Sequence, residues 1–255
     1  MSGLAAQTAA MLERVRARRP RVHCITNDAA HYFTADVLLA LGAEPSLTLA
    51  PDEIAAFVAS ADALLVNLGT LDQSRLKAID IALDTAQAYG IPFVFDPVFI
   101  DRSEPRSRLA RDIASRSPAV VRANAAEARL LAGADGEDAW RQLARNLGTV
   151  VAVTGEEDVV TDGSGVIRLA NGDRLMQRLT AMGCGGSAIV AAFVGIETDI
   201  LAAAAAALLV TGVAGEIAAL HARGPGSFRP AFLDALYELD GPTISARARI
   251  EEVRA

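Results

Sequence analysis

The stretch Thr180-Ala181-Met182-Gly183-Cys184-Gly185-Gly186-Ser187 places a cysteine among glycines directly before an apolar segment, residues 188–194. We expect the apolar segment to be a helix and the glycine-rich stretch to form its N-terminal end, which we call the mouth of the helix. The first N–H groups of a helix lack acceptors within it, and the helix dipole favours negative charge there. Glycines also let a ligand approach the backbone closely. With one acidic side chain to deprotonate an alcohol, such a mouth indicates a small-molecule kinase without a lysine-bearing phosphate loop.

Composition permits this interpretation without requiring it. The chain has 255 residues, 52% of them hydrophobic, which is enough to bury the core of a single α/β domain over residues 1–255. Its 24 Lys and Arg against 31 Asp and Glu give a net charge of −7. This charge argues against a nucleic-acid partner and favours small ligands.

The sequence also indicates a cytoplasmic protein. Its only cysteines, Cys24 and Cys184, cannot build a disulfide framework, and its first residues show no basic, apolar and small-residue signal pattern. The longest uncharged run, residues 200–215, falls short of the roughly 20 apolar residues that a membrane-spanning helix needs. We therefore expect this run to be a buried helix and expect no membrane partner.

Helical and strand-like segments alternate along the chain, which favours an α/β fold with a largely parallel central sheet flanked by helices. Strands are expected at residues 22–25, 44–49, 63–66, 93–95, 119–121 and 150–153. The spacing then changes, and residues 159–161, 166–169 and 174–179 are expected to be strands joined by hairpin turns at Asp162-Gly163 and Asn171-Gly172. The C-terminal third is expected to be helical again.

Polar residues follow several of these expected strands. Ligands bind outside the carboxyl ends of the strands in open α/β sheets, so this position favours a binding site. Each polar residue taken alone is better explained as a cap for the next helix. Only the set, together with the Gly183-Cys184 turn, indicates a site: Thr26, Asn67, Asp96, Asn124 and Thr154.

A series of motifs in a fixed order covers most of the chain, from Val22 to the helix after Cys184. It comprises Val22-His23-Cys24-Ile25-Thr26-Asn27, Phe33-Thr34-Ala35, residues 38–43, Asn67-Leu68-Gly69-Thr70-Leu71, Asp96-Pro97-Val98, Arg122-Ala123-Asn124-Ala125-Ala126-Glu127, Val153-Thr154-Gly155-Glu156 and Gly183-Cys184. The series resembles the hydroxyethylthiazole kinase family of the ribokinase-like superfamily. The resemblance implies a ribokinase-like three-layer fold, ATP and Mg²⁺ as cofactors, and a homotrimer with substrate sites between subunits. The implied reaction is phosphorylation of the hydroxyl of 5-(2-hydroxyethyl)-4-methylthiazole in thiamine salvage.

The resemblance implies a catalytic role for Cys184, which takes the place of the catalytic aspartate found elsewhere in the superfamily. A thiol at a helix start can have a lowered pKa and act as a base. The alternative is a small, packed and inert cysteine. By the same resemblance, the alcohol contacts Leu47, Ala181, Asn27 and Gly69, although core packing explains Leu47 equally well.

The resemblance assigns ATP binding to Arg122, Asn124 and Thr154, and Mg²⁺ binding to Glu127 and Asp96. Asn124 and Glu127 are three residues apart, so one helical face carries both. A capping box without metal is the alternative for this pair, and a solvated side chain is the alternative for Arg122. Thr154 could equally belong to an ordinary turn at the end of a strand.

Two positions depart from the family pattern. Ala181 stands where the family has glycine, and its methyl group is expected to crowd the alcohol or the backbone turn. Phe99-Ile100-Asp101 replaces a small glycine-rich turn, where an unpaired Asp101 carboxylate would repel the nucleotide. Three functions therefore stay open: the thiazole kinase, a kinase of another small alcohol, and a ligand-binding paralogue without phosphoryl transfer.

Overall fold

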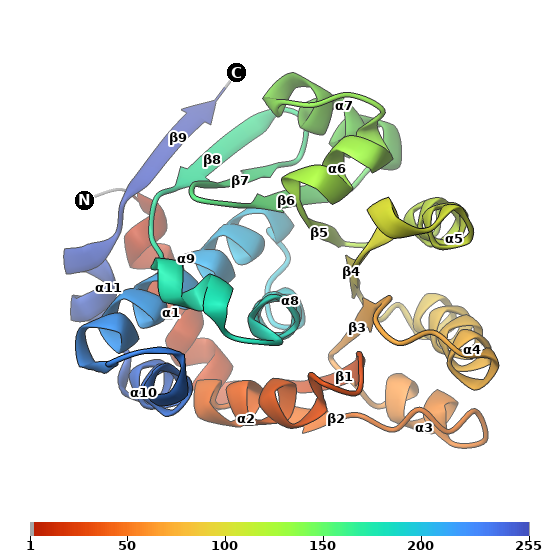
Figure 1. Ribbon diagram of the computed structural model, residues 1–255, viewed down its shortest axis with the longest axis horizontal. Coiled ribbons are helices and arrows are strands. Elements are labelled where there is room, and N and C mark those ends of the chain that lie inside the picture. The colour runs from red at the N-terminus through yellow and green to blue at the C-terminus, as the bar shows by residue number, and fades with distance from the viewer. Residues whose placement is uncertain (1–2, 255) are drawn as a thin grey trace.

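The computed structural model describes residues 3–254, which form a nine-stranded sheet between two layers of helices (Figure 1). The strand order is β2-β1-β3-β4-β5-β6-β7-β8-β9. The parallel strands are β1 (Arg21–Ile25), β2 (Glu44–Ser46), β3 (Ala63–Asn67), β4 (Phe93–Asp96), β5 (Val120–Asn124) and β6 (Val150–Thr154). The antiparallel strands β7 (Asp158–Thr161), β8 (Gly165–Leu169) and β9 (Ile250–Arg254) complete one edge. The expected largely parallel sheet is confirmed.

Alternate residues of the central strands enter opposite layers of the core. In β3, Ala63 and Leu65 belong to one hydrophobic cluster, whereas Leu64 and Val66 belong to the other. The first layer contains α1 (Gly3–Arg18), α2 (His31–Leu41), α8 (Met182–Val194), α9 (Ile200–His221), α10 (Pro225–Glu238) and α11 (Gly241–Arg247). The second contains α3 (Ile54–Ala59), α4 (Gln73–Tyr89), α5 (Glu104–Ala114), α6 (Ala125–Ala132) and α7 (Glu137–Leu147). Both faces of the apolar parallel strands are thereby removed from water.

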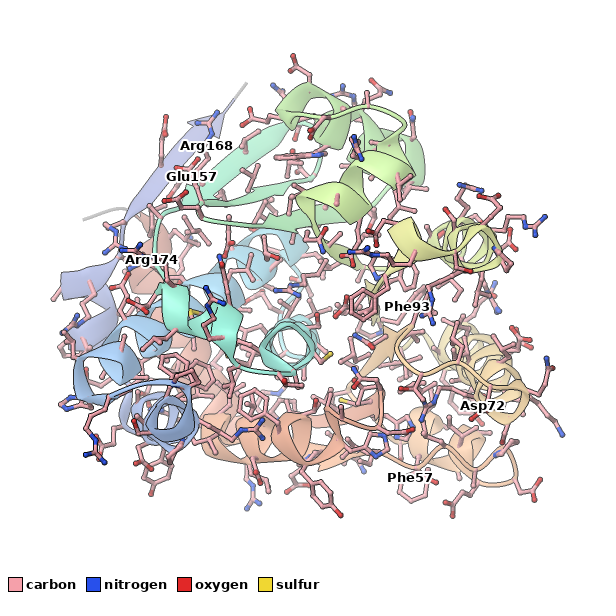
Figure 2. All side chains as sticks on the ribbon, viewed as in Figure 1. Phe57, Asp72, Phe93, Glu157, Arg168 and Arg174 are labelled. Atoms are coloured by element: carbon pink, nitrogen blue, oxygen red, sulfur yellow. The ribbon has the colours of Figure 1, made fainter. Side chains whose placement is uncertain are left out.

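Short polar side chains fix several helix starts. Asp72, which is labelled in Figure 2, accepts the Arg75 N–H at 2.7 Å and caps α4. Asp199 and Asp240 cap α9 and α11 in the same way. Each cap satisfies an N–H group that has no acceptor within its helix, which stabilises the helix by about 1 kcal/mol.

The helix α9 contains the alanine-rich run of residues 200–215. It is long and apolar enough to cross a membrane by length and composition, yet 78% of its most apolar stretch is buried inside the fold. It packs against α1, α8 and α10, where small side chains let helices approach closely. The expectation of a buried helix for this run is confirmed.

Two expectations for the segment after β8 are wrong. Residues 174–179 are not a strand, because Arg174–Arg178 form a 3-10 helix, η2, and Asn171-Gly172 is not a hairpin turn. The place beside β8 is taken by β9, a strand that the sequence pattern did not predict. Glu216 of α9 holds the segment instead, because its Oε1 accepts hydrogen bonds from Asn171 Nδ2 and Gly172 N, each at 3.0 Å. The expected hairpin between β7 and β8 is confirmed.

Two glycines of α9 test how tightly this segment is packed. A Cβ at Gly212 would come 2.7 Å from the Asn171 carbonyl oxygen, whereas a Cβ at Gly215 would meet only the flexible thioether of Met176. Overpacking against backbone costs about 1–3 kcal/mol, and alanine returns about 1 kcal/mol of helix propensity. We expect Gly212→Ala to lower the free energy of unfolding, measured by urea denaturation, by about 1 kcal/mol. Gly215→Ala is the matched control and should leave stability unchanged or raised; equal effects would contradict this packing.

Candidate active site

The sheet has a topological switch point between β1 and β3, since β2 lies on one side of β1 and β3 on the other. The helix α2 belongs to the layer of α8, whereas α3 belongs to the opposite layer. A crevice opens at such a point, outside the carboxyl ends of the strands. Asn27 follows β1, and Asn67 ends β3 in register with Asp96 at the end of β4. Three of the predicted polar residues therefore meet at the crevice.

Cys184 lies at this crevice in the first turn of α8. Its Sγ is 3.1 Å from Nδ2 of Asn27 and 3.4 Å from Nδ2 of Asn67. The same Asn67 nitrogen donates to Asp96 Oδ2 at 2.8 Å, and Ser187 Oγ donates to that oxygen at 2.7 Å. Side chains from the loop after β1, the ends of β3 and β4, and one helix thus form a single hydrogen-bonded cluster around the thiol and a buried carboxylate.

The ionisation of Cys184 differs from the sequence-based expectation. Burial, followed by the charge of Asp96, raises the pKa of the Cys184 thiol to about 11. The expected lowering at a helix start is wrong, because removal from water disfavours the thiolate more than nearby hydrogen-bond donors favour it. The thiol is therefore protonated at neutral pH.

Arg122 of β5 reaches across the mouth of α8. Its Nη1 would lie 3.1 Å from a Cβ at Gly183 and its Nη2 3.8 Å from a Cβ at Gly186, so the glycines make room for the guanidinium. The N–H groups of Gly183 and Cys184 belong to the first turn, where helix geometry provides no acceptor. A fixed cation beside such N–H groups favours the binding of an anion such as phosphate.

The positive charge of Arg122 interacts with three carboxyl groups, those of Asp96, Glu127 and Asp158. Burial raises the pKa of each carboxyl group, and the positive charge of Arg122 opposes that rise in every case. The charge of Asp96 adds to the increase in the pKa of Glu127. A single guanidinium cannot balance three carboxylates, so further positive charge would be stabilised here.

Asp96 and Glu127 fit a divalent cation that arrives together with phosphate oxygens. Both Glu127 oxygens accept backbone N–H groups, from Phe99 and Asn124, each at 3.0 Å. Across residues 3–254, no three His, Cys, Asp or Glu side chains are arranged to hold a metal by themselves. Mg²⁺ is often held by only one or two carboxylates with waters and substrate phosphates, so this donor set suits it. The metal role of the two acids stays a prediction.

An open cleft of about 990 Å³ adjoins the mouth of α8. Its lining includes Arg122, Asn124 and Thr154, which are the three residues predicted to bind ATP. The opposite wall is formed by α9 and by the η2 segment, where Arg174 lines the cleft (Figure 2). The part of this wall formed by η2 was not predicted, because a strand was expected at residues 174–179.

The capping box between Asn124 and Glu127 is present, which leaves a metal role for Glu127 open. Asn124 Oδ1 accepts the Glu127 N–H at 2.9 Å, and Glu127 returns a bond to the Asn124 N–H. The cap fixes Glu127 beside Arg122, so capping and a functional role are compatible. Asp158, which sequence analysis did not select, accepts the Gly155 N–H at 3.0 Å and closes the turn after Thr154. The only sequence signal for Asp158 was its place three residues after that glycine.

The residues predicted to contact the alcohol are only partly brought together. Gly69 lies against Asn27 so closely that a Cβ at Gly69 would collide with the Asn27 Cβ, and Asn27 in turn contacts Cys184. Ala181 is the N-cap residue of α8. Leu47 follows β2 and packs, partly buried, against the core cluster of the α8 layer, as its core-packing alternative predicts.

The two departures from the family pattern share one backbone property. Ala181 has φ of 71° and Phe99 has φ of 60°, both in the left-handed region that favours glycine. The departures therefore keep a glycine-like backbone at the cost of strain, on the order of 1 kcal/mol or more at each position. Asp101 is paired, because its carboxylate lies 3.0 Å from Nε of Arg102, so it does not meet the condition of an unpaired acid that would repel the nucleotide.

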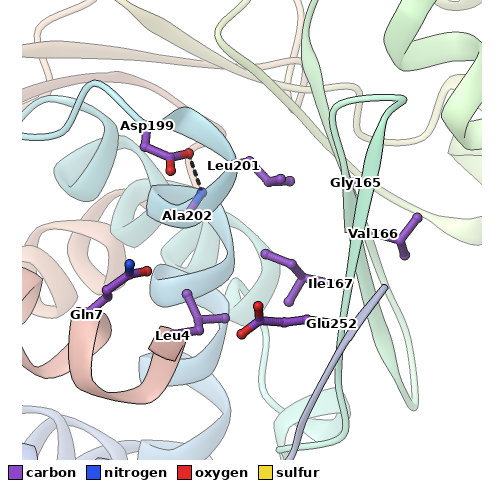
Figure 3. Close-up of a pocket in the computed structure, with 9 residues that line it drawn as sticks. All are labelled: Leu4, Gln7, Gly165, Val166, Ile167, Asp199, Leu201, Ala202 and Glu252. Atoms are coloured by element: carbon purple, nitrogen blue, oxygen red, sulfur yellow. Dashed lines mark hydrogen bonds between the residues drawn. The ribbon is translucent and has the colours of Figure 1, made fainter. Parts of the chain in front are cut away.

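A second, smaller hollow of about 110 Å³ lies among α1, β8, β9 and the start of α9 (Figure 3). Gly165 and Val166, which line it, begin β8 next to Thr161, and Thr161 pairs with Val151 near the start of β6. The hollow is thus at the amino end of the parallel strands, away from the crevice. Its Asp199 carboxylate already caps α9.

A helix mouth with a fixed cation, a crevice at the switch point and an acid-lined cleft define a ribokinase-like small-molecule kinase. The pyridoxal kinase from Staphylococcus aureus in complex with AMP-PCP and pyridoxal shares the fold, with a TM-score of 0.67 over 92% of this chain and 99% of that one. Sequence identity to that structure is 14%, so this likeness concerns the fold alone.

The chain belongs to the hydroxyethylthiazole kinase family, whose model matches residues 12–241. It is 44% identical to a probable hydroxyethylthiazole kinase of Agrobacterium fabrum, over 97% of this chain and 96% of that protein. It is 45% identical to a hydroxyethylthiazole kinase of Pectobacterium carotovorum, over 92% and 94% of the two chains. The structure of hydroxyethylthiazole kinase from Pyrococcus horikoshii superimposes with a TM-score of 0.93 at 37% identity, covering 97% of this chain and 99% of that one.

Asp158 gives the site a testable pH dependence. Burial raises the pKa of its carboxyl group from 3.8 to about 6. The charged form costs roughly 3 kcal/mol of stability, a cost that is complete above pH 6 and disappears as the pH falls towards 4. We expect Asp158→Asn to be more stable than the unmodified protein in urea denaturation at pH 7.5, with a much smaller advantage at pH 4.5. An advantage independent of pH would contradict this ionisation.

Proposed function

We propose that this protein transfers the γ-phosphoryl group of ATP to the hydroxyl of 5-(2-hydroxyethyl)-4-methylthiazole in thiamine salvage. The observation that carries the proposal is the cluster of Cys184, Asn67 and Asp96 at the mouth of α8, directly beside the cleft that Arg122 lines. Family membership supports the choice of alcohol, because relatives 44–45% identical over most of the chain are named hydroxyethylthiazole kinases.

In the proposed reaction, the triphosphate occupies the cleft and the γ-phosphoryl group faces the mouth of α8. Arg122 and the N–H groups of Gly183 and Cys184 stabilise the negative charge that spreads over the transferring group. The alcohol oxygen forms a bond to phosphorus while the bond to the β-phosphate oxygen breaks. Asp96 and Glu127 would hold Mg²⁺, which would supply positive charge to the phosphate oxygens when bound.

Cys184 is proposed to contact the alcohol. Because its thiol is protonated at neutral pH, it serves first to position the hydroxyl between the amides of Asn27 and Asn67. The transition state of phosphoryl transfer is loose, so the alcohol proton leaves late, passes to an oxygen of the phosphoryl group being transferred, and requires no resting thiolate. A misplaced hydroxyl would still be costly, because small displacements of reacting groups lower rates strongly.

We expect Cys184→Ala to lower kcat for the thiazole alcohol by roughly 10²-fold, because a positioned catalytic contact is lost. ADP release with ATP, magnesium and the alcohol measures this change. Cys24→Ala is the control, since that thiol is buried in the core away from the crevice and its loss should leave kcat within a factor of about two. Unchanged turnover in Cys184→Ala would remove the catalytic assignment.

The proposed metal role of Glu127 predicts a change in magnesium dependence. We expect Glu127→Gln to raise the magnesium concentration at half-maximal ADP release several-fold, because a neutral amide attracts the cation less. Glu156→Gln removes a charge from an exposed residue that also lines the cleft, so it is the matched control. Identical magnesium curves for Glu127→Gln and the control would rule out the metal role.

Two alternatives are separated by the same assay. ADP release with another small alcohol, but none with the thiazole, would indicate a kinase whose pocket has changed. Nucleotide binding without turnover on any alcohol would indicate a ligand-binding paralogue. The strained Ala181 and Phe99 backbones, where the family sequence pattern is broken, are the features that favour testing both.

We further propose a cytoplasmic homotrimer, for which light scattering after size-exclusion chromatography is the direct test. The surface of α2 supports a subunit contact, because Tyr32 is 87% and Leu39 58% exposed. The two side chains are two helical turns apart in α2, so they lie on the same face. Exposed large apolar side chains that share a face are typical of interaction surfaces. A monomer at working concentrations would contradict this assembly.

A further inference from the structure

Arg75 is a buried arginine that lies outside the ATP cleft and has no role in the chemistry described above. Its side chain, from the first turn of α4, is 4% exposed. Nη1 donates to the carbonyl oxygen of Gly69 at 3.3 Å and to that of Thr70. Nη2 donates to Oδ1 of Asp28 at 2.7 Å. One guanidinium therefore joins the loop after β1 to the loop after β3.

The stability of α4 does not explain this placement. A cation in the first turn of a helix is disfavoured by the helix dipole, and Asp72 already caps α4. Burial of a guanidinium is costly unless its donors are satisfied. Arginine suits the position because its planar fork can serve several acceptors at fixed angles, which the ammonium of lysine cannot.

The two tied loops lead directly to the reacting thiol. Gly69 N–H donates to Oδ1 of Asn67 at 3.0 Å, which fixes that amide so that its Nδ2 points at Cys184 and Asp96. Gly69 also packs against Asn27, the other amide that contacts the thiol.

The backbone of the loop after β3 needs such a restraint. Thr70 has φ of 47°, in the left-handed region that a β-branched residue adopts rarely. Strain of this kind persists only where surrounding contacts enforce it. The bonds from Arg75 to the carbonyl oxygens of Gly69 and Thr70, which lie on either side of the Thr70 Cα, provide that enforcement.

We propose that Arg75 is a positioning residue for the alcohol half of the active site. It holds the loops after β1 and β3 together, so that Asn27 and Asn67 keep their amides on the Cys184 sulfur. This inference rests on the proposed function, since it assigns the alcohol to Cys184. None of the residues that line the ATP cleft belongs to the loops after β1 and β3, so Arg75 acts on the alcohol and not on the nucleotide.

Steady-state kinetics test the assignment. We expect Arg75→Met to raise KM for the alcohol at least tenfold and to lower kcat, with KM for ATP changed less than twofold. Arg75→Lys should recover part of the loss, because an ammonium can still reach one or two acceptors. Arg116→Met is the matched control: it removes an arginine that pairs with Asp84 of α4, and both KM values should stay unchanged. Equal increases in both KM values for Arg75→Met would overturn the proposal.

A second readout needs no turnover and no substrate. The rate at which methyl methanethiosulfonate modifies Cys184, followed by peptide mass spectrometry, reports how closely Asn27 and Asn67 cover the sulfur. We expect at least tenfold faster modification in Arg75→Met than in Arg116→Met, and an unchanged rate would overturn the proposal. Cys24 is fully buried, so its modification reports global unfolding. If Cys24 also reacts in Arg75→Met, the rate of Cys184 modification in Arg75→Lys is compared with that in Arg116→Met instead, and an unchanged rate there overturns the proposal. Failure of the unmodified protein to phosphorylate any alcohol would count against the proposed function and leave this comparison valid.

Discussion

The guanidinium of Arg122 at the mouth of α8 is the contact on which the rest of the site depends. It is the cation that opposes the raised pKa values of Asp96, Glu127 and Asp158, three acids that β4, α6 and β7 bring out of water. Removing it would leave desolvated carboxylates without a counter-charge, which is among the most costly changes in a folded protein. The guanidinium also needs glycine at position 183, because a Cβ there would lie 3.1 Å from its Nη1. The choice of glycine in this stretch is therefore set by Arg122 as well as by the ligand.

Local patterns predicted the parallel half of the fold but not the far edge of the sheet. The apolar runs of β3 and β6 and the Asp162-Gly163 turn are readable because neighbouring residues alone decide them. The η2 segment is not, because the place beside β8 is filled by β9 from the end of the chain. Glu216, which holds Asn171 and Gly172, is also distant in sequence. Such contacts override local turn preferences.

The same distinction holds for the site. Asn67, Asp96 and Asn124 could be chosen from sequence because each ends a strand. The ionisation of Cys184 could not, because burial decides its direction and depends on the packing of every layer. Contacts between loops, such as those of the Arg75 side chain, produce no hydrophobic periodicity and so cannot be predicted from the sequence pattern.

Ala181 keeps a left-handed backbone without being glycine, with φ of 71°. Alanine and glycine codons differ by a single nucleotide, so one mutation separates this chain from the family pattern at a position where both residues can share one backbone. The alanine narrows the conformations open to the chain before folding, but at a positive φ it strains the folded turn by more than that entropy gain returns. Glycine at this position would therefore favour folding, so selection that keeps the alanine would act through the methyl group's contact with whatever alcohol the crevice accepts.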